Sequence, residues 1–218
     1  AVVPEAPTLL STMFRLELNT GAFAQAEVIL EQLMAMLAEN PVNPTFHYPA
    51  AVAEVGMSCR YTGALKEPAL PSKFADIVLS SPFATPLFSS ITATGLAYDA
   101  LVRGDREACQ RAYDALATKN VVNSFAGASP LVGQLALAVG AVSGAIEHFE
   151  QSMAFCAKAG YRPDYAWTCW GYAAALLERD GDGDFSRAEG LLDEALQIAT
   201  DLGMPPLRLR VEDLIAQI

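Results

Sequence analysis

Five glycines recur at similar intervals along the chain, and each is followed by an apolar stretch with helix-like spacing. They are Gly21, Gly63, Gly104, Gly140 and Gly183, separated by 42, 41, 36 and 43 residues. Glycine accepts the left-handed backbone conformation that ends a helix and turns the chain. A glycine that recurs between helix-like stretches predicts one short unit of two helices, repeated along the sequence.

Apolar residues spaced by one, three and four positions predict two amphipathic helices in each unit. We expect units at about 8–41, 44–81, 84–120, 129–160 and 163–203, followed by a terminal helix at 206–218. The second unit is degraded by Pro68 and Pro71, because proline in a helix interior costs ~3 kcal/mol, and 65–71 is expected to be a loop or a broken helix. The 218 residues are expected to form one helical-repeat domain, a fragment of a larger protein.

Packing positions also recur at fixed distances from the glycines. Five residues after each glycine come Ala26, Pro68, Cys109, Ala145 and Ala188. Seven residues before it come Phe14, Gly56, Ala97 and Gly133, and Gly171 is the counterpart in the fifth unit. Apart from Phe14 and Pro68, the residues at these positions are small, which predicts close approach between helices. Units that stack in this way form an α-solenoid.

This order of small residue, turn glycine and buried alanine resembles the tetratricopeptide repeat. The fifth unit carries the resemblance best, at Trp167, Trp170, Gly171, Ala174, Ala188, Leu192 and Ala195. The resemblance implies an all-α fold, a right-handed superhelix of about five TPR-like helix pairs plus a C-terminal helix.

A narrower resemblance covers 101–214, through RGDREA at 103–108, AIEHF at 145–149, AGYRP at 159–163, LDEA at 192–195 and LGMP at 202–205. These stretches are similar to the C-terminal helical-repeat regions of large bacterial LuxR-type ATPase regulators and multidomain class III nucleotide cyclases. No Walker motif, cyclase signature or helix-turn-helix accompanies them. The resemblance implies a regulatory or interaction region in a bacterial signalling or transcription regulator.

Charge and hydropathy exclude several classes of partner. The net charge is −11 with only 14 Lys and Arg, so direct nucleic-acid binding is not expected. Apolar runs fall short of the ~20 residues that span a bilayer, so no membrane association is expected. The cysteines are widely spaced and form no C-x-x-C pair, which favours buried thiols in the cytoplasm; they are Cys59, Cys109, Cys156 and Cys169.

No pattern predicts a catalytic, cofactor or metal site. Asp180, Asp182 and Asp184 alternate like the start of a calcium loop, but position six is Phe185 and position twelve is Leu191, so a solvated turn is favoured. His47 and His148 are expected at the surface or between repeats. No catalytic motif is present, so we expect a protein that is not an enzyme.

Aromatic residues gather near the start of the fifth unit. Trp167 and Trp170 fall on repeat packing positions, three residues apart, which favours a structural role. Tyr161, Arg162 and Tyr165 lie near a helix start and are the better candidates for contact with a partner or ligand.

Two functions stay open. The first is a non-catalytic scaffold whose concave face receives a protein segment or another domain of the same polypeptide. The second is a sensor that binds a small effector within the superhelix and controls an attached ATPase, cyclase or DNA-binding domain, with the small residues from Ser89 to Ala97 leaving room for the effector. Association into a homo-oligomer is a third possibility.

Overall fold

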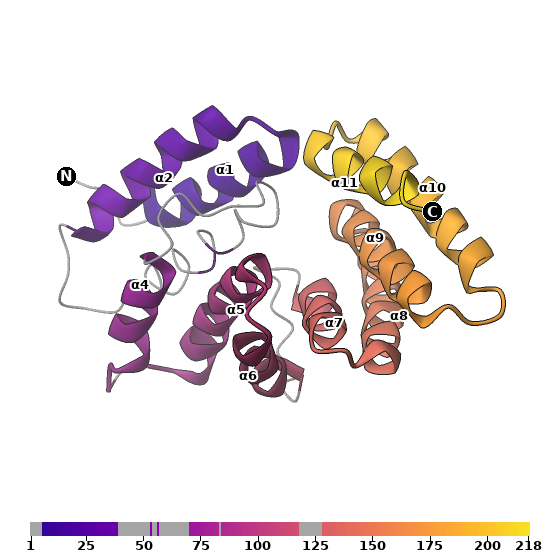
Figure 1. The fold of residues 1–218 in the computed structure, drawn as a ribbon. Helices are drawn as coiled ribbons and strands as arrows, with labels where there is room; N and C mark the ends of the chain where they lie inside the picture. The colour runs from indigo at the N-terminus through magenta and orange to yellow at the C-terminus, as the bar shows by residue number, and fades with distance from the viewer. Residues whose placement is uncertain (1–5, 39–52, 54–55, 57–69, 83, 118–127) are drawn as a thin grey trace.

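The computed structural model describes residues 6–38, 53, 56, 70–82, 84–117 and 128–218. Every regular element in these residues is an α-helix, which confirms the all-α prediction (Figure 1). In chain order the helices are α1 (Ala6–Thr20), α2 (Phe23–Ala38), α4 (Leu70–Leu79), α5 (Pro86–Arg103), α6 (Arg106–Ala117), α7 (Ala128–Ala138), α8 (Val142–Ala159), α9 (Arg162–Arg179), α10 (Asp184–Asp201) and α11 (Pro205–Ile215).

Proline and polar caps set several helix starts close to the predicted positions. Pro86 opens α5, and the Thr85 hydroxyl accepts a hydrogen bond from the Phe88 amide at 3.2 Å. Pro71 was expected to end a loop, but it lies in the first turn of α4, where the missing amide costs no helical hydrogen bond. The first part of the predicted second unit, residues 44–69, lies outside the described residues except for positions 53 and 56.

Three of the turn glycines behave as predicted, since Gly21, Gly104 and Gly140 have φ values of 75°, 62° and 85°. Gly63 lies outside the described residues. The fifth turn differs, because Asp180 ends α9 with a φ of 49° and Gly183 precedes α10 instead of ending the helix before it. In the shorter turns at Gly104 and Gly140 the glycine ends the first helix and the next residue, Asp105 or Ala141, precedes the second helix.

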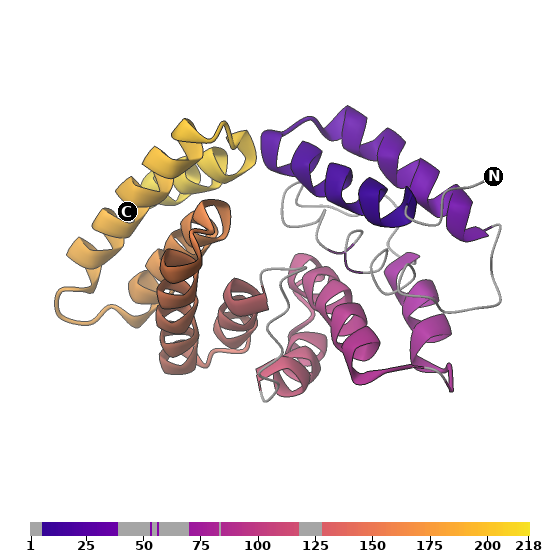
Figure 2. The ribbon, with the colours of Figure 1, turned by 180° about the vertical axis from the view of Figure 1, so that it is seen from behind.

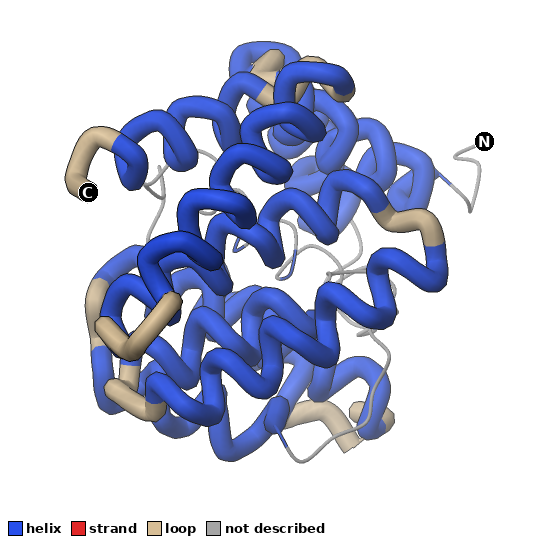
Figure 3. The backbone as a smooth tube through the Cα atoms, turned by 90° about the vertical axis from the view of Figure 1, so that its right-hand side faces the viewer, coloured by secondary structure: helices blue, strands red, loops and turns tan. Residues whose placement is uncertain are grey.

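The helices form two rows that differ in their contacts. α5, α7, α9 and α11 touch in sequence and form an inner row. α6, α8 and α10 contact helices next to them in the chain, and within the described residues α6 does not touch α8, nor α8 touch α10. Because the helices of the inner row lie closer together than α6, α8 and α10 do, the chain curves towards the inner row. Figures 1 and 2 show the resulting arc, and Figure 3 shows the short loops that join the helices.

The two ends of the arc meet. α11 packs against α9 and α10, so it takes the next place in the inner row, and it also touches α1. A Cβ placed on Gly21 would lie 3.5 Å from Cγ of Pro205, which puts the turn after α1 against the start of α11. The C-terminal end of α1, the first described helix, therefore meets the start of α11, the last described helix (Figure 1).

Glycines at the predicted packing positions do allow close helix contacts. Phe149 of α8 is fully buried, and the same edge of its ring, at Cδ1, Cε1 and Cζ, lies close to both Gly133 of α7 and Gly171 of α9. A Cβ on either glycine would come within 2.7 Å of the ring. A Cβ on Gly56 would likewise come too close to the backbone of Gly95, at its carbonyl oxygen. The small residues thus serve helix packing.

None of the described helices is both long enough and apolar enough to cross a bilayer.

Candidate ligand-binding cavity

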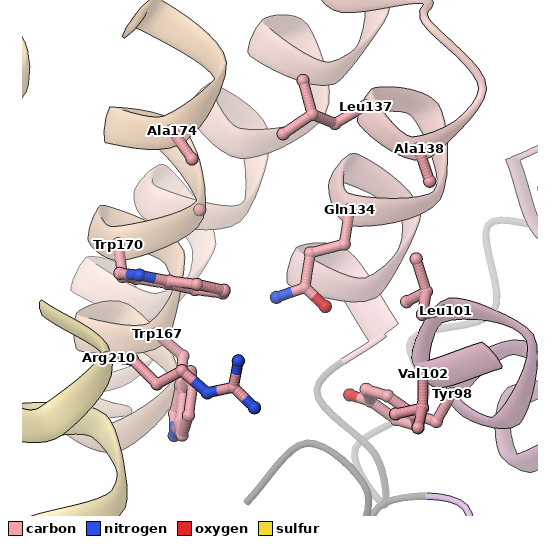
Figure 4. A pocket seen from close by; sticks show the side chains of 11 residues that line it. Tyr98, Leu101, Val102, Gln134, Leu137, Ala138, Trp167, Trp170, Ala174 and Arg210 are labelled. Carbon is pink, nitrogen blue, oxygen red and sulfur yellow. The ribbon is translucent and has the colours of Figure 1, made fainter. Parts of the chain in front are cut away.

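A cavity of about 420 Å³ opens on the inner row of helices. Its walls come from α5, α7, α9 and α11, so it joins three successive predicted units and the terminal helix (Figure 4). The lining residues are Tyr98, Leu101, Val102, Gln134, Leu137, Ala138, Trp167, Trp170, Gly171, Ala174 and Arg210.

Repeat geometry explains the wall that α5 and α7 provide. Three residues of α5 line the cavity, and three residues of α7 line it from equivalent positions, 36 residues further on; the pairs are Tyr98 with Gln134, Leu101 with Leu137, and Val102 with Ala138. Their turn glycines, Gly104 and Gly140, are also 36 residues apart. Equivalent helices in neighbouring units therefore present the same side to the cavity.

The opposite wall is aromatic. Trp167 and Trp170 of α9 pack edge to face, with ring centroids 5.8 Å apart and planes at 89°. Trp167 is only 1% exposed, so the prediction of a structural role is confirmed, yet its ring also borders the cavity. These are the two tryptophans of the chain. Trp170 is partly buried, and its indole nitrogen has no hydrogen-bond acceptor among the described residues.

A cation reaches into this apolar space. The guanidinium of Arg210, on α11, points into the cavity, as does the amide of Gln134 on α7 (Figure 4). None of the described lining residues is acidic, and no described carboxylate forms an ion pair with Arg210. Other arginines of the structure do have such partners, for example Arg208 with Glu212 at 3.8 Å. Among the described residues, the cavity thus has a positive group without a matching negative one.

The predicted contact residues lie elsewhere. Tyr161 precedes α9, is 46% exposed and packs against Phe155. Arg162 pairs with Asp201 at 3.1 Å, and the Tyr165 hydroxyl donates to Glu194 at 3.3 Å.

These three side chains link α9 to α8 and α10 and do not line the cavity. Burial raises the pKa of Tyr165 to about 12, so its hydroxyl stays protonated. Their role in binding stays a prediction.

The small residues expected to leave room for an effector are packed instead. Ser90, Thr92 and Thr94 are buried, and the Ser90 and Thr94 hydroxyls donate to carbonyls one turn earlier in α5. Gly95 contacts Gly56, so this part of α5 serves close approach between helices. The cavity begins one residue beyond the segment, at Tyr98.

The acidic loop is a helix-to-helix turn. Arg179 donates to both carboxylate oxygens of Asp184, at 2.7 and 2.5 Å, and the Gly181 amide adds a third hydrogen bond at 3.0 Å. The Arg179 hydrogen bonds hold the pKa of Asp184 at about 2. Since this carboxylate is already engaged, it is not free for a cation, and no group of acidic, histidine or cysteine side chains in the described residues has metal-binding geometry.

Titratable groups outside the cavity have structural partners. His148 lies between repeats as predicted, with Nε2 3.2 Å from the Tyr113 hydroxyl, and burial lowers its pKa. Cys109, Cys156 and Cys169 are free and buried, in line with the prediction of structural thiols. Burial raises the pKa of Cys169 to about 12. His47 and Cys59 lie outside the described residues.

The lining offers binding groups more than reacting ones. It contains hydrogen-bond donors, a cation and apolar walls, but within the described residues it has no serine, cysteine, histidine or carboxylate to act as nucleophile or base.

The chain matches no known protein family, no curated protein and no solved structure.

Proposed function

We propose that this chain is a non-catalytic helical-repeat module that binds its partner at the inner row of helices, α5, α7, α9 and α11. In this proposal the repeats are of the tetratricopeptide type, wound into a right-handed superhelix. The partner is a protein segment or another domain of the same polypeptide, in a cytoplasmic bacterial regulator of signalling or transcription. The observation that carries the proposal is the cavity in which three successive units and the terminal helix converge.

The composition of the cavity supports binding. Tryptophan, tyrosine and arginine are the residues that most often dominate binding energy, and all three line this one space. Stacked helical repeats generally bind along the face formed by their inner helices. Since the described lining has no nucleophile with a base, recognition is the function that these residues support.

A second candidate is the effector sensor, and a specific observation favours it. Small-molecule sites typically have volumes of ~300–1,000 Å³ with apolar walls and a few polar groups. The cavity has about 420 Å³ and directs one cation and one amide into an apolar space. A ligand there would touch four helices at once and would favour one curvature of the arc over another.

Site-specific photo-cross-linking tests where the partner binds. A photoreactive amino acid at Ala174, on the cavity wall, is compared with the same residue at Glu189, which is exposed on α10. In cells of the source organism we expect a specific covalent adduct, to a protein or to another part of the parent polypeptide, from position 174 and not from 189. Equal labelling at both positions, or labelling at 189 alone, would contradict the proposal.

A further inference from the structure

The cavity has three properties that together limit what fits it: aromatic walls, a guanidinium that pairs with no carboxylate of the described residues, and a described lining without acidic residues. We propose that it binds a small organic carboxylate with a flat aromatic body. This inference rests on the proposed function, because it names a ligand class for the same inner row of helices, as the effector of the second candidate.

Charge selects the carboxylate. The formal net charge of the chain is −11, yet the cavity receives Arg210 and no described acidic side chain. An arginine fork matches the two oxygens of a carboxylate, and such charge-assisted hydrogen bonds are about twice as strong as neutral ones. Apolar surroundings strengthen the attraction further by lowering the local dielectric constant. Gln134 offers an amide to the same space, across from Arg210 (Figure 4).

Shape selects the aromatic body. Trp167 and Trp170 stand on one side of the cavity and Tyr98 on the other, with Leu101 and Val102 near Tyr98 (Figure 4). A flat ring that enters between the two sides can stack on the indole of Trp170, which is only partly buried, whereas Trp167 and Tyr98 are almost fully buried and form the walls behind it. A purely aliphatic or strongly hydrated anion would make no such stacking contact.

Ligand binding would also tie the terminal helix to the inner row. Arg210 comes from α11, while the remaining walls come from α5, α7 and α9. α11 touches α1 as well, at the point where the arc closes. A carboxylate held by Arg210 and surrounded by the other three helices therefore stabilises the closed arrangement, which gives the effector a means of changing the shape of the module.

Intrinsic fluorescence provides a direct assay, since both tryptophans of the chain line the cavity. The full chain is titrated with phenylacetate and, as a matched neutral probe, with phenylacetamide, under excitation that selects tryptophan. We expect a saturable change in emission with phenylacetate and at least tenfold weaker binding of phenylacetamide, which corresponds to ~1.4 kcal/mol.

Variants assign the effect to the guanidinium. Arg210→Gln is expected to weaken phenylacetate binding about tenfold or more, and Arg210→Lys to give an intermediate loss, because lysine keeps the charge without the fork. Arg208→Gln, on the exposed side of the same helix, is the control and is expected to bind as the unaltered chain does. Circular dichroism establishes that each variant is folded; if Arg210→Gln is not, Arg210→Lys carries the comparison.

Equal binding of the two probes, binding unchanged by either Arg210 substitution, or no binding of phenylacetate would overturn the inference. Its failure is distinguishable from failure of the proposed function. If a partner is captured through position 174 but phenylacetate does not bind, the proposal of a binding module is supported and the proposal of an aromatic carboxylate ligand is rejected. If neither a captured partner nor phenylacetate binding is observed, both the binding module and the aromatic carboxylate are ruled out.

Discussion

The contact of Phe149 with two glycines gives a quantitative test of how the helices pack. In Gly171→Ala the new Cβ would lie 2.7 Å from the Phe149 ring, about 1 Å closer than the ~3.5–4.0 Å optimum between carbon atoms. The ring has little room to move, because it is fully buried, Gly133 of α7 also lies against it, and Tyr172 stacks on it at 6.3 Å between centroids. The substitution therefore overpacks a fully buried site.

Two opposing terms set the expected change in stability. Overpacking costs about 1–3 kcal/mol, whereas replacing glycine by alanine inside a helix gains about 0.8–1 kcal/mol. The two terms leave Gly171→Ala with a net loss of about 0–2 kcal/mol, which lowers Tm by up to roughly 8 °C for a chain of this size. Gly190→Ala is the matched control, since Gly190 lies within α10 with nothing within 4 Å of the added Cβ. That control is expected to gain up to ~1 kcal/mol.

A double-mutant cycle isolates the clash. In a Phe149→Leu background the ring is gone, so Gly171→Ala is expected to cost nothing and to gain the helix-propensity term alone. Urea unfolding followed by circular dichroism measures all four proteins of the cycle. The packing argument is refuted if Gly171→Ala and Gly190→Ala have equal effects, or if the loss at Gly171 persists without the Phe149 ring.

Further predictions concern α10, α6 and a buried thiol. Because Arg179 holds the pKa of Asp184 at about 2, below the ordinary 3.8, the stability from this pair is present above about pH 4 and is lost as pH falls towards 2. The Tm of Asp184→Asn should accordingly lie below that of the unaltered chain at neutral pH and converge with it near pH 2. The Asp105 carboxylate accepts from the Ala108 amide at 2.9 Å as the cap of α6, so Asp105→Ala should cost about 1 kcal/mol in urea unfolding, and an unchanged midpoint would argue against the cap. Burial raises the pKa of Cys169 to about 12, so mass spectrometry should find it unlabelled by iodoacetamide in the native chain at pH 8 and labelled in denaturant, whereas rapid native labelling would contradict its burial.

Local chemistry allowed the sequence to predict the helices. Proline and glycine have strong positional preferences, so the bounds of α5 and the turns at Gly104 and Gly140 follow from them directly. The fifth turn was harder, because Asp180 takes the left-handed conformation usually left to glycine. Pro71 was also hard to place from residue type alone, because the penalty for proline depends on how far inside the helix it lies.

The cavity was not predicted from the sequence, although part of the signal was there. The positions six, three and two residues before Gly104 and Gly140 all line it, so superimposing the two units would have grouped them. Arg210 had no such signal, because its role depends on how α11 packs against α9. The contact candidates Tyr161, Arg162 and Tyr165 were chosen for residue type at a helix start, which does not reveal the side of the helix that neighbours occupy.

Hydrogen exchange on the chain in complex with the partner captured through position 174 tests the central claim most directly. If the inner row is the binding face, backbone amides of α5, α7, α9 and α11 exchange more slowly in the complex, while those of α6, α8 and α10 keep their rates. Protection confined to α6, α8 and α10, with the inner row unchanged, would contradict the assignment of the binding face.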